Sequence, residues 1–107
     1  MSDQETPPQS IAMIDTEIAK RVAEIFAAMA DPGRLRIISA LSHHELSVGE
    51  LSDSVEMTES ATSHQLRLLR TMRIVRTRKV GHQVFYALDD DHIHDLLDRA
   101  VEHVHHR

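Results

Sequence analysis

The chain has 107 residues, a net charge of −5 and no cysteine. This length favours one compact domain, and we expect a flexible N-terminal arm over residues 1–15 followed by that domain over residues 16–107. Disulfides, thiolate metal sites and a cysteine nucleophile are excluded, which is consistent with a cytoplasmic location. Residues 1–10 lack the apolar core of a signal peptide, and no later stretch is as long as a membrane span, so we expect no membrane partner.

The first half of the domain predicts two helices. Between residues 17 and 29, apolar side chains recur at three- and four-residue spacing, which is the pattern of an amphipathic helix. Asp31 and Pro32 indicate a second helix start, because aspartate caps backbone N–H groups and proline fits the first helical turn. We expect this second helix to end at about His43 and His44.

Two further helices, separated by a brief connection, come next. The segment 47–50, Ser-Val-Gly-Glu, has the form of a capping box and predicts a short helix that ends near Val55. Another helix is expected over about 61–72, capped by Thr58 or Ser60. Such a pair predicts a helix-turn-helix, whose second helix enters the major groove of DNA.

Two β-rich runs, 74–78 and 83–88, follow this pair and flank a segment that contains Gly81. They predict a β-hairpin, or wing, ahead of a terminal helix over about 90–106. The expected order is therefore α-α-α-α-β-β-α, a mainly α fold of the winged helix-turn-helix class.

The distribution of charge favours DNA binding by this part of the chain. No Asp or Glu lies between Ala61 and Leu88, whereas six Arg and Lys residues do, and the rest of the chain carries 6 basic and 17 acidic residues. A basic segment supplies the positive potential that phosphates require, and short polar side chains on the second helix can reach base edges. The residues that we expect to contact DNA are Ser60, Thr62, Ser63, His64, Gln65, Arg67, Arg78, Lys79 and His82.

The terminal helix holds histidines with an informative spacing. His92 and His103 are eleven residues apart, about three turns, so they project from nearly the same face. They are also about 16 Å apart along the helix axis, whereas zinc–ligand bonds are about 2 Å long, so one chain cannot place both on one ion. If the helix packs antiparallel against its copy across a two-fold axis, His92 of one chain lies beside His103 of the other.

Two more side chains complete this expected inter-subunit site. His106 follows His103 at i+3, and Asp90 can reach the site if it lies in the non-helical turn before the helix. Asp90 and His92 from one chain, with His103 and His106 from the other, suit tetrahedral Zn²⁺. Co²⁺ can substitute for zinc, and Ni²⁺ stays open because His94 or His105 could supply further ligands. Because the ligands of each ion would come from two chains, the spacing predicts a homodimer.

Several stretches resemble the ArsR/SmtB family of metal-responsive repressors. They are residues 30–36, 45–51, 59–67 and 84–88, and the resemblance covers roughly residues 17–106. It implies a terminal-helix sensor site, and the ligands that match the family's pattern are Asp90, His92, His103 and His106. It also implies that Ser60, Ser63, His64 and Gln65 occupy the DNA-contacting positions of the recognition helix.

The resemblance implies a function as well. A metal-free homodimer would bind an imperfect inverted repeat in double-stranded operator DNA, and metal binding would release it and derepress genes for metal efflux or sequestration. A cysteine-based second sensor site of some relatives is not expected, because Ser47 occupies its helix position. Glu56 replaces the family's usual glycine in the helix–helix turn, which costs about 1 kcal/mol if that position must be left-handed.

Three other functions fit the sequence less well. A winged-helix repressor with a non-metal effector is the main alternative, and it would leave the histidines incidental. A metal-buffering or metal-delivery protein would have no use for the basic wing and the polar helix. An enzyme is least favoured, because four protein ligands leave a metal no open position and no nucleophile–base pair is present.

Overall fold

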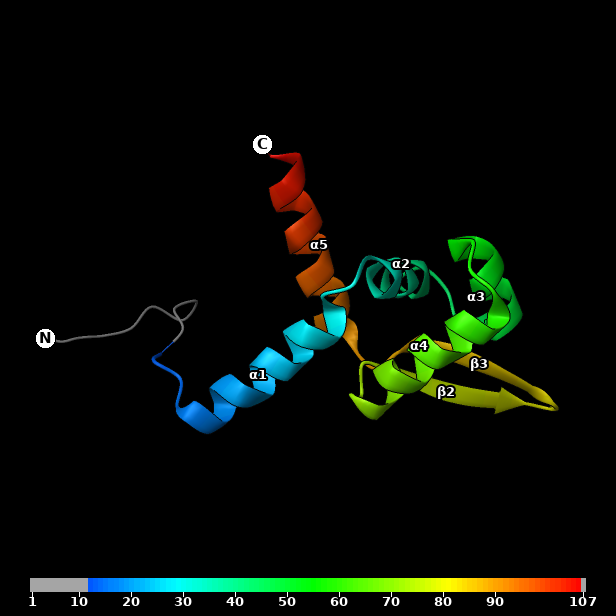
Figure 1. Ribbon diagram of the computed structural model, residues 1–107, viewed down its shortest axis with the longest axis horizontal. Coiled ribbons are helices and arrows are strands. Elements are labelled where there is room, and N and C mark those ends of the chain that lie inside the picture. Colours follow the sequence, from blue (N-terminus) through cyan, green and yellow to red (C-terminus); the bar gives the residue numbers. More distant parts are fainter. Residues whose placement is uncertain (1–11, 107) are drawn as a thin grey trace, which may run out of the picture.

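The computed structural model describes residues 12–106, and Figure 1 shows their arrangement. Within this range the elements are α1 (Thr16–Met29), α2 (Pro32–Leu41), β1 (Leu46–Ser47), α3 (Val48–Val55), α4 (Glu59–Thr71), β2 (Val75–Val80), β3 (Gln83–Leu88) and α5 (Asp91–His105). The expected order is confirmed with one addition, β1, whose two residues are too few to produce an alternating pattern. Most of the expected N-terminal arm lies outside the described residues.

Each helix begins at a side chain that accepts a hydrogen bond from the backbone of its first turn. These caps are Asp15, Asp31, Ser47, Thr58 and Asp90. The predicted capping box is present, since Oγ of Ser47 accepts from the Glu50 N–H at 3.2 Å and Oε1 of Glu50 accepts from the Ser47 N–H at 2.9 Å. The sequence therefore located these helix starts. Of the two candidate caps of α4, Thr58 rather than Ser60 caps the helix, which starts at Glu59, and α2 ends at Leu41, before His43.

The turn between α3 and α4 does require a left-handed residue. Glu56 has φ 58° and ψ 46°, a conformation that costs a non-glycine residue about 1 kcal/mol or more. Nη1 of Arg36, in α2, donates to the carbonyl oxygen of Val55 at 3.1 Å and so satisfies one free acceptor at the end of α3. Gly81, with φ 62°, makes the turn of the hairpin as expected.

The three strands form an antiparallel sheet in the order β1-β3-β2. Phe85 of β3 is paired with Ser47 on one side and with Arg78 on the other. Because side chains alternate along a strand, Arg76 and Arg78 share one face of the sheet, while buried Val75 faces the interior. The outer face of the wing therefore carries two arginines.

The core lies between the helix-turn-helix and the inner face of the sheet. Its fully buried members are Ile37 and Ile38 of α2, Leu51 of α3, Leu66 and Leu69 of α4, and Ile74 and Val75 beside the wing. Leu66 and Leu69 face inward as their spacing predicts. The recognition helix is thus fixed by its apolar side, and its opposite side is free for contacts.

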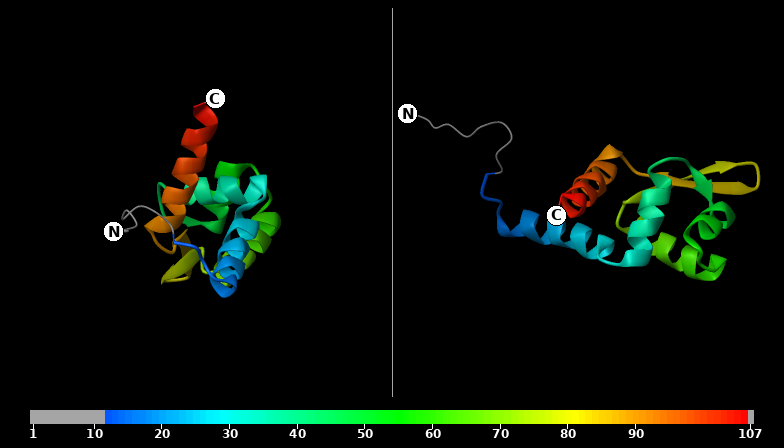
Figure 2. Two further views of the ribbon diagram at one scale, coloured as in Figure 1. Left: turned by 90° about the vertical axis from the view of Figure 1, so that its left-hand side faces the viewer. Right: turned by 90° about the horizontal axis from the view of Figure 1, so that it is seen from above.

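Two helices extend from this body, away from the wing, as the views in Figures 1 and 2 show. In α1 only Ala28 and Met29 are buried, and Phe26 is 54% exposed. In α5 only Ile93 is buried, and Val104 is 66% exposed. Both helices therefore carry apolar side chains that this single chain does not cover. No helix among residues 12–106 is long and apolar enough to cross a membrane.

Candidate DNA-binding and metal-binding sites

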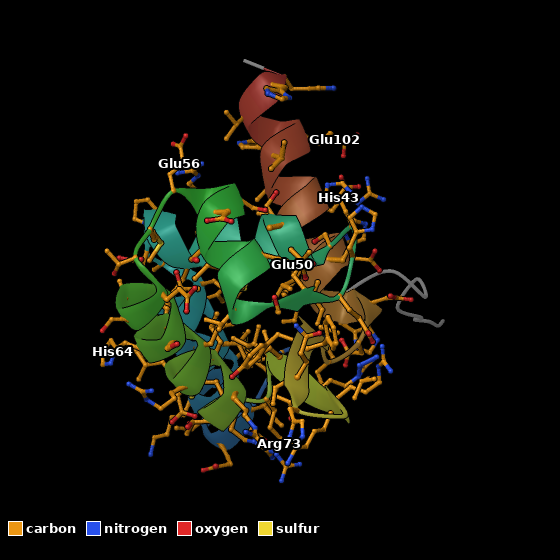
Figure 3. All side chains as sticks on the ribbon, turned by 90° about the vertical axis from the view of Figure 1, so that its right-hand side faces the viewer. His43, Glu50, Glu56, His64, Arg73 and Glu102 are labelled. Carbon is orange, nitrogen blue, oxygen red and sulfur yellow. The ribbon has the colours of Figure 1, made fainter. Side chains whose placement is uncertain are left out.

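The outer side of α4 presents most of the polar residues expected to contact DNA. Ser60, His64 and Arg67 are exposed, and Ser63 and Gln65 are partly buried. His64 projects from the helix away from the core (Figure 3). Oε1 of Gln65 is buried and has no hydrogen-bond partner within the described chain. Ser60, Ser63, His64 and Arg67 recur at three- and four-residue spacing and therefore share one face of α4, whereas Gln65 lies to the side of that face.

Thr62 does not belong to this surface, and its expected role in DNA contact is wrong. Its side chain is 0% exposed, and its Oγ1 donates to the carbonyl oxygen of Thr58 at 2.8 Å. The reason is helical phase: Thr62 lies four residues before Leu66 and seven before Leu69, so all three face the core. The same spacing in the sequence could have identified it as a core residue.

The wing residues differ in their availability to DNA. Lys79 and His82 are exposed near the tip of the hairpin. Arg78 is 60% exposed, but its Nε and Nη2 both donate to Oε1 of Glu45, at 3.0 and 2.6 Å. Its guanidinium carbon also lies 5.8 Å from the centre of the Phe85 ring, within the range of a cation–π contact. Sequence reasoning did not anticipate this acidic partner.

The ion pair changes the protonation equilibria of both of its members. The hydrogen bond from Arg78 holds the pKa of Glu45 below its ordinary value, and the charges of Arg78 and Arg76 act in the same direction. In return, the hydrogen bond to Glu45 and its charge raise the pKa of Arg78. Glu45 is therefore charged at neutral pH and cancels part of the positive potential of the wing.

Asp90 and His92 are already close together at the start of α5. Asp90 is the N-cap of the helix, in extended backbone conformation, as its expected role requires. Its Oδ1 accepts from the His92 N–H at 2.8 Å, and its Oδ2 lies 3.3 Å from Nδ1 of His92. The His92 side chain is 86% exposed. One carboxylate oxygen and one imidazole nitrogen thus stand together at the surface.

His103 and His106 lie at the other end of the same helix. Both are exposed, and His106 is the C-cap that follows the last residue of α5. The intervening helix is regular, so His92 and His103 are separated by about 16 Å along the axis. Within residues 12–106, no three His, Asp or Glu side chains are arranged so that they could hold a metal ion. A single chain therefore presents two separate pairs of candidate ligands, which is the arrangement that an inter-subunit site requires.

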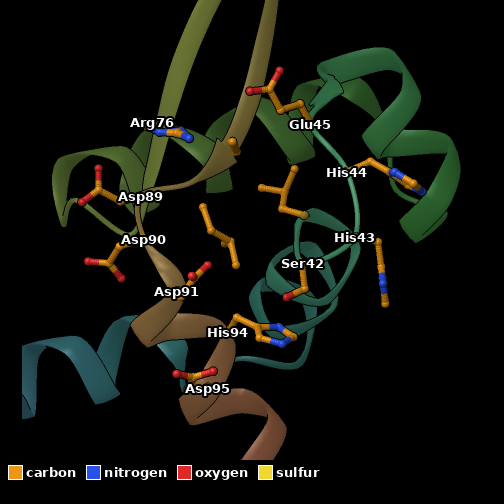
Figure 4. Close-up of a pocket in the computed structure, with 13 residues that line it drawn as sticks. Ser42, His43, His44, Glu45, Arg76, Asp89, Asp90, Asp91, His94 and Asp95 are labelled. Carbon is orange, nitrogen blue, oxygen red and sulfur yellow. The ribbon is translucent and has the colours of Figure 1, made fainter.

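Four further histidines, at positions 43, 44, 94 and 105, belong to neither of these pairs. His94 is partly buried and lines an open hollow of about 570 Å³ between α2, the base of the wing and α5 (Figure 4). His43 and His44 are exposed at its rim. His105 is exposed on α5. The wall of the hollow also holds Glu45 and Arg76.

Comparison with known proteins identifies the family of this chain. The family described as bacterial regulatory protein, arsR family, matches residues 31–77, from the cap of α2 into β2. The transcriptional repressor SmtB homolog of Synechocystis sp. is 46% identical over 86 residues, which are 80% of this chain and 65% of that protein. The regulator NmtR of Mycobacterium tuberculosis is 39% identical over 95 residues, 89% of this chain and 79% of NmtR. The chain belongs to the ArsR family.

Solved structures of similar proteins share the fold. The solution structure of apo-NmtR has a TM-score of 0.76 at 36% identity and covers 98% of this chain and 88% of its own. Reduced HlyU from Vibrio cholerae has a TM-score of 0.71, also at 36% identity, and covers 77% of this chain and 86% of its own. The ArsR family consists of DNA-binding transcription regulators rather than enzymes. The winged helix-turn-helix described above is thus the DNA-binding unit of this ArsR protein.

Proposed function

We propose that this ArsR-family protein is a metal-responsive repressor. As a metal-free homodimer it binds an imperfect inverted repeat in operator DNA, and it dissociates when Zn²⁺, or Co²⁺ or Ni²⁺, binds between the terminal helices. Its release derepresses genes for metal efflux or sequestration in the cytoplasm. The proposal treats residues 16–107 as one domain for DNA binding, dimerisation and sensing. The observation that carries it is the separation of Asp90 and His92 from His103 and His106 on one exposed helix.

The uncovered apolar side chains of α1 and α5 support the homodimer. Those exposed on α1 include Ile18, Val22 and Phe26, and those on α5 include Leu96 and Val104. Exposure of such an apolar surface to water is unfavourable, and a second copy of the chain would bury it. An antiparallel pair of α5 helices would cross midway between His92 and His103, next to Leu96.

The donor set fits a divalent metal ion of the zinc type. Asp90 and His92 of one protomer, with His103 and His106 of its partner, would hold it through one carboxylate and three imidazoles. A bound ion supplies a cross-link between the two terminal helices. Asp90 can keep its capping bond through Oδ1, because Oδ2, which lies 3.3 Å from Nδ1 of His92, takes no part in the cap. Ligation therefore does not require α5 to unwind at its start.

The sensor helix is joined to the wing without a flexible linker. The Asp89 N–H donates to the carbonyl oxygen of Ile74 at 2.9 Å, between the end of β3 and the residue before β2. Asp90 then caps α5. A change in the angle of α5 would therefore be passed to the base of the hairpin, and with it to the DNA-binding surface. Because binding is reciprocal, operator DNA would weaken metal binding by the same factor that metal weakens DNA binding.

The first test is fluorescence anisotropy of a labelled duplex from the protein's own promoter. Zinc at one equivalent per protomer should weaken wild-type binding at least tenfold, which is about 1.4 kcal/mol of coupling. The variant His103→Ala should bind the metal-free duplex normally and should not respond to zinc. Equal binding with and without zinc by the wild type would refute metal regulation and leave DNA binding intact.

A mixing experiment tests whether the site lies between subunits. One double variant lacks Asp90 and His92, and the other lacks His103 and His106, each residue being replaced by alanine. Neither should bind zinc tightly as a homodimer. Their heterodimer restores one complete site of the two, so co-refolded mixtures should recover tight zinc binding. Failure of the mixture to bind, although the heterodimer forms, would rule out the shared site.

The alternative is a winged-helix repressor that responds to a non-metal effector. The similarity to HlyU, whose solved form is described as reduced, makes a redox effector worth considering. A thiol switch is excluded because this chain has no cysteine. If His103→Ala responded to zinc as the wild type does, another effector would have to be sought.

A further inference from the structure

One carboxylate interrupts the basic surface of the wing. Glu45 lies one residue before β1 and shares the wall of the hollow with Arg76 and Ala87 (Figure 4). Its Oε1 accepts two hydrogen bonds from Arg78, a residue 33 positions away in the sequence. Because the two residues meet through the pairing of β1 and β2 with the central strand β3, the contact belongs to the folded wing and not to a local motif.

The ion pair is not needed to hold the wing in position. The hairpin is fixed by six paired positions between β2 and β3, and β1 pairs with β3 at Leu46 and Ser47. Ile74 and Val75 anchor its base in the core. An ion pair as exposed as that of Glu45 and Arg78 contributes little to stability. Its principal effect is therefore on charge.

Glu45 pairs with the guanidinium of Arg78, a group that a DNA phosphate could otherwise bind. Nε and Nη2 of Arg78 form the edge of the guanidinium that could otherwise take two oxygens of a phosphate. In the free protein both are directed to the same carboxylate oxygen. A phosphate that approached Arg78 would have to displace Glu45, and it would also be repelled by that residue's negative charge.

We propose that Glu45 restrains the affinity of this protein for DNA by competing with phosphate for Arg78. The restraint acts on the phosphate backbone and is therefore independent of base sequence. It lowers binding to specific and non-specific DNA by the same factor and keeps the complex weak enough to be released by an effector. It rests on DNA binding by the proposed repressor and does not depend on metal.

The test compares Glu45→Gln with a matched control. Glutamine keeps the length of the side chain and removes its charge. Glu102→Gln makes the same change on α5, where Oε1 of Glu102 accepts from Nη1 of Arg99 at 3.1 Å, far from the wing. Metal-free proteins are titrated into the promoter duplex and into an unrelated duplex of equal length, at several salt concentrations.

Glu45→Gln should bind both duplexes about three- to tenfold more tightly near 0.1 M salt, with an unchanged ratio between them. Its affinity should also fall more steeply with salt, by about the slope of one additional phosphate contact. Glu102→Gln should bind like the wild type. Arg78→Gln should weaken binding more in the Glu45→Gln background than in the wild type, because only there is Arg78 free.

Two outcomes would overturn the inference. One is a Glu45→Gln affinity equal to that of Glu102→Gln. The other is weaker binding by Glu45→Gln, which would mean that Glu45 positions Arg78 for DNA rather than withholding it. Either result, obtained with a wild type that binds DNA and responds to zinc, leaves the proposed function standing. A wild type that binds no DNA would refute both.

Discussion

Asp90 caps α5 with one carboxylate oxygen and holds the other 3.3 Å from Nδ1 of His92. The same side chain therefore fixes the start of the helix and places a candidate ligand pair at the surface. These two roles use different oxygens and depend on different properties. Capping needs an acceptor, whereas metal ligation at this site needs the negative charge as well.

Substitutions of Asp90 should separate the two roles. Asp90→Asn keeps a capping oxygen, so stability should change by less than about 0.5 kcal/mol, while zinc affinity should fall more than tenfold. Asp90→Ala should show the same fall in zinc affinity as Asp90→Asn, and its free energy of unfolding should be about 1 kcal/mol lower because the cap is lost. Urea denaturation and zinc titration of both variants provide the measurements. Wild-type zinc affinity in Asp90→Asn would exclude this carboxylate as a ligand.

A charge placed at Leu96 should dissociate the proposed dimer. Leu96 is one helical turn after His92, is 39% exposed, and lies near the expected crossing of the two α5 helices. Leu96→Asp would bury two carboxylates against each other and should give a monomer at micromolar concentration in sedimentation velocity experiments. His105→Asp adds the same charge on another side of α5 and should leave the mass unchanged. A dimeric Leu96→Asp protein would place the interface elsewhere.

Replacement of the left-handed residue between α3 and α4 by glycine should stabilise the protein. Glu56→Gly removes the steric cost of φ 58° and should raise the free energy of unfolding by about 0.5–1 kcal/mol. Asp53→Gly, at an exposed position inside α3, should instead lower it by roughly 0.3 kcal/mol, because glycine has a lower helix propensity than aspartate. Urea denaturation measures the change in both variants, because a shift of the midpoint at an unchanged dependence on urea reports a change in the free energy of unfolding. A loss of stability in Glu56→Gly would show that the glutamate makes compensating interactions.

Thr62 and His64 should respond differently although they are two residues apart. His64 is exposed on α4, so His64→Ala should weaken operator binding several-fold. Thr62→Val removes a buried hydroxyl that bonds within the helix, so it should cost about 1 kcal/mol of stability and leave DNA affinity nearly unchanged. Anisotropy titrations below the unfolding transition distinguish the two effects. A large loss of affinity in folded Thr62→Val would contradict its assignment to the core.

Local chemistry made much of the fold predictable. Asp31, Ser47 and Thr58 act as caps because their side chains satisfy backbone donors only a few residues away. The hairpin and the spacing of His92 and His103 on one helix also depend on short-range geometry. The expectations that rested on these patterns are confirmed for the fold, while the metal ligands and most DNA contacts remain predictions.

The rest was missed for two different reasons. Thr62 has the residue type of a contact surface, although its spacing from Leu66 and Leu69 gives it the helical phase of the core, so the signal was present in the sequence. Glu45 and Arg78 meet only because β1 joins the sheet, and a strand of two residues leaves no periodic signal. The partner of a charged side chain is thus set by the topology of the sheet, which short-range patterns in the sequence do not specify.

The hydrogen bond between the Asp89 N–H and the Ile74 carbonyl oxygen ties the base of the hairpin to the start of α5. The orientation of α5 relative to the wing is consequently set at Asp89. A chimera that grafts a relative's terminal helix onto this chain should be joined after Asp90, since a residue inserted or deleted at Asp89 would turn the helix by about 100° relative to the hairpin. New preferences of the proposed metal site can then be introduced by point substitution along α5 or by extension beyond His106, both of which leave the wing and the helix-turn-helix unchanged.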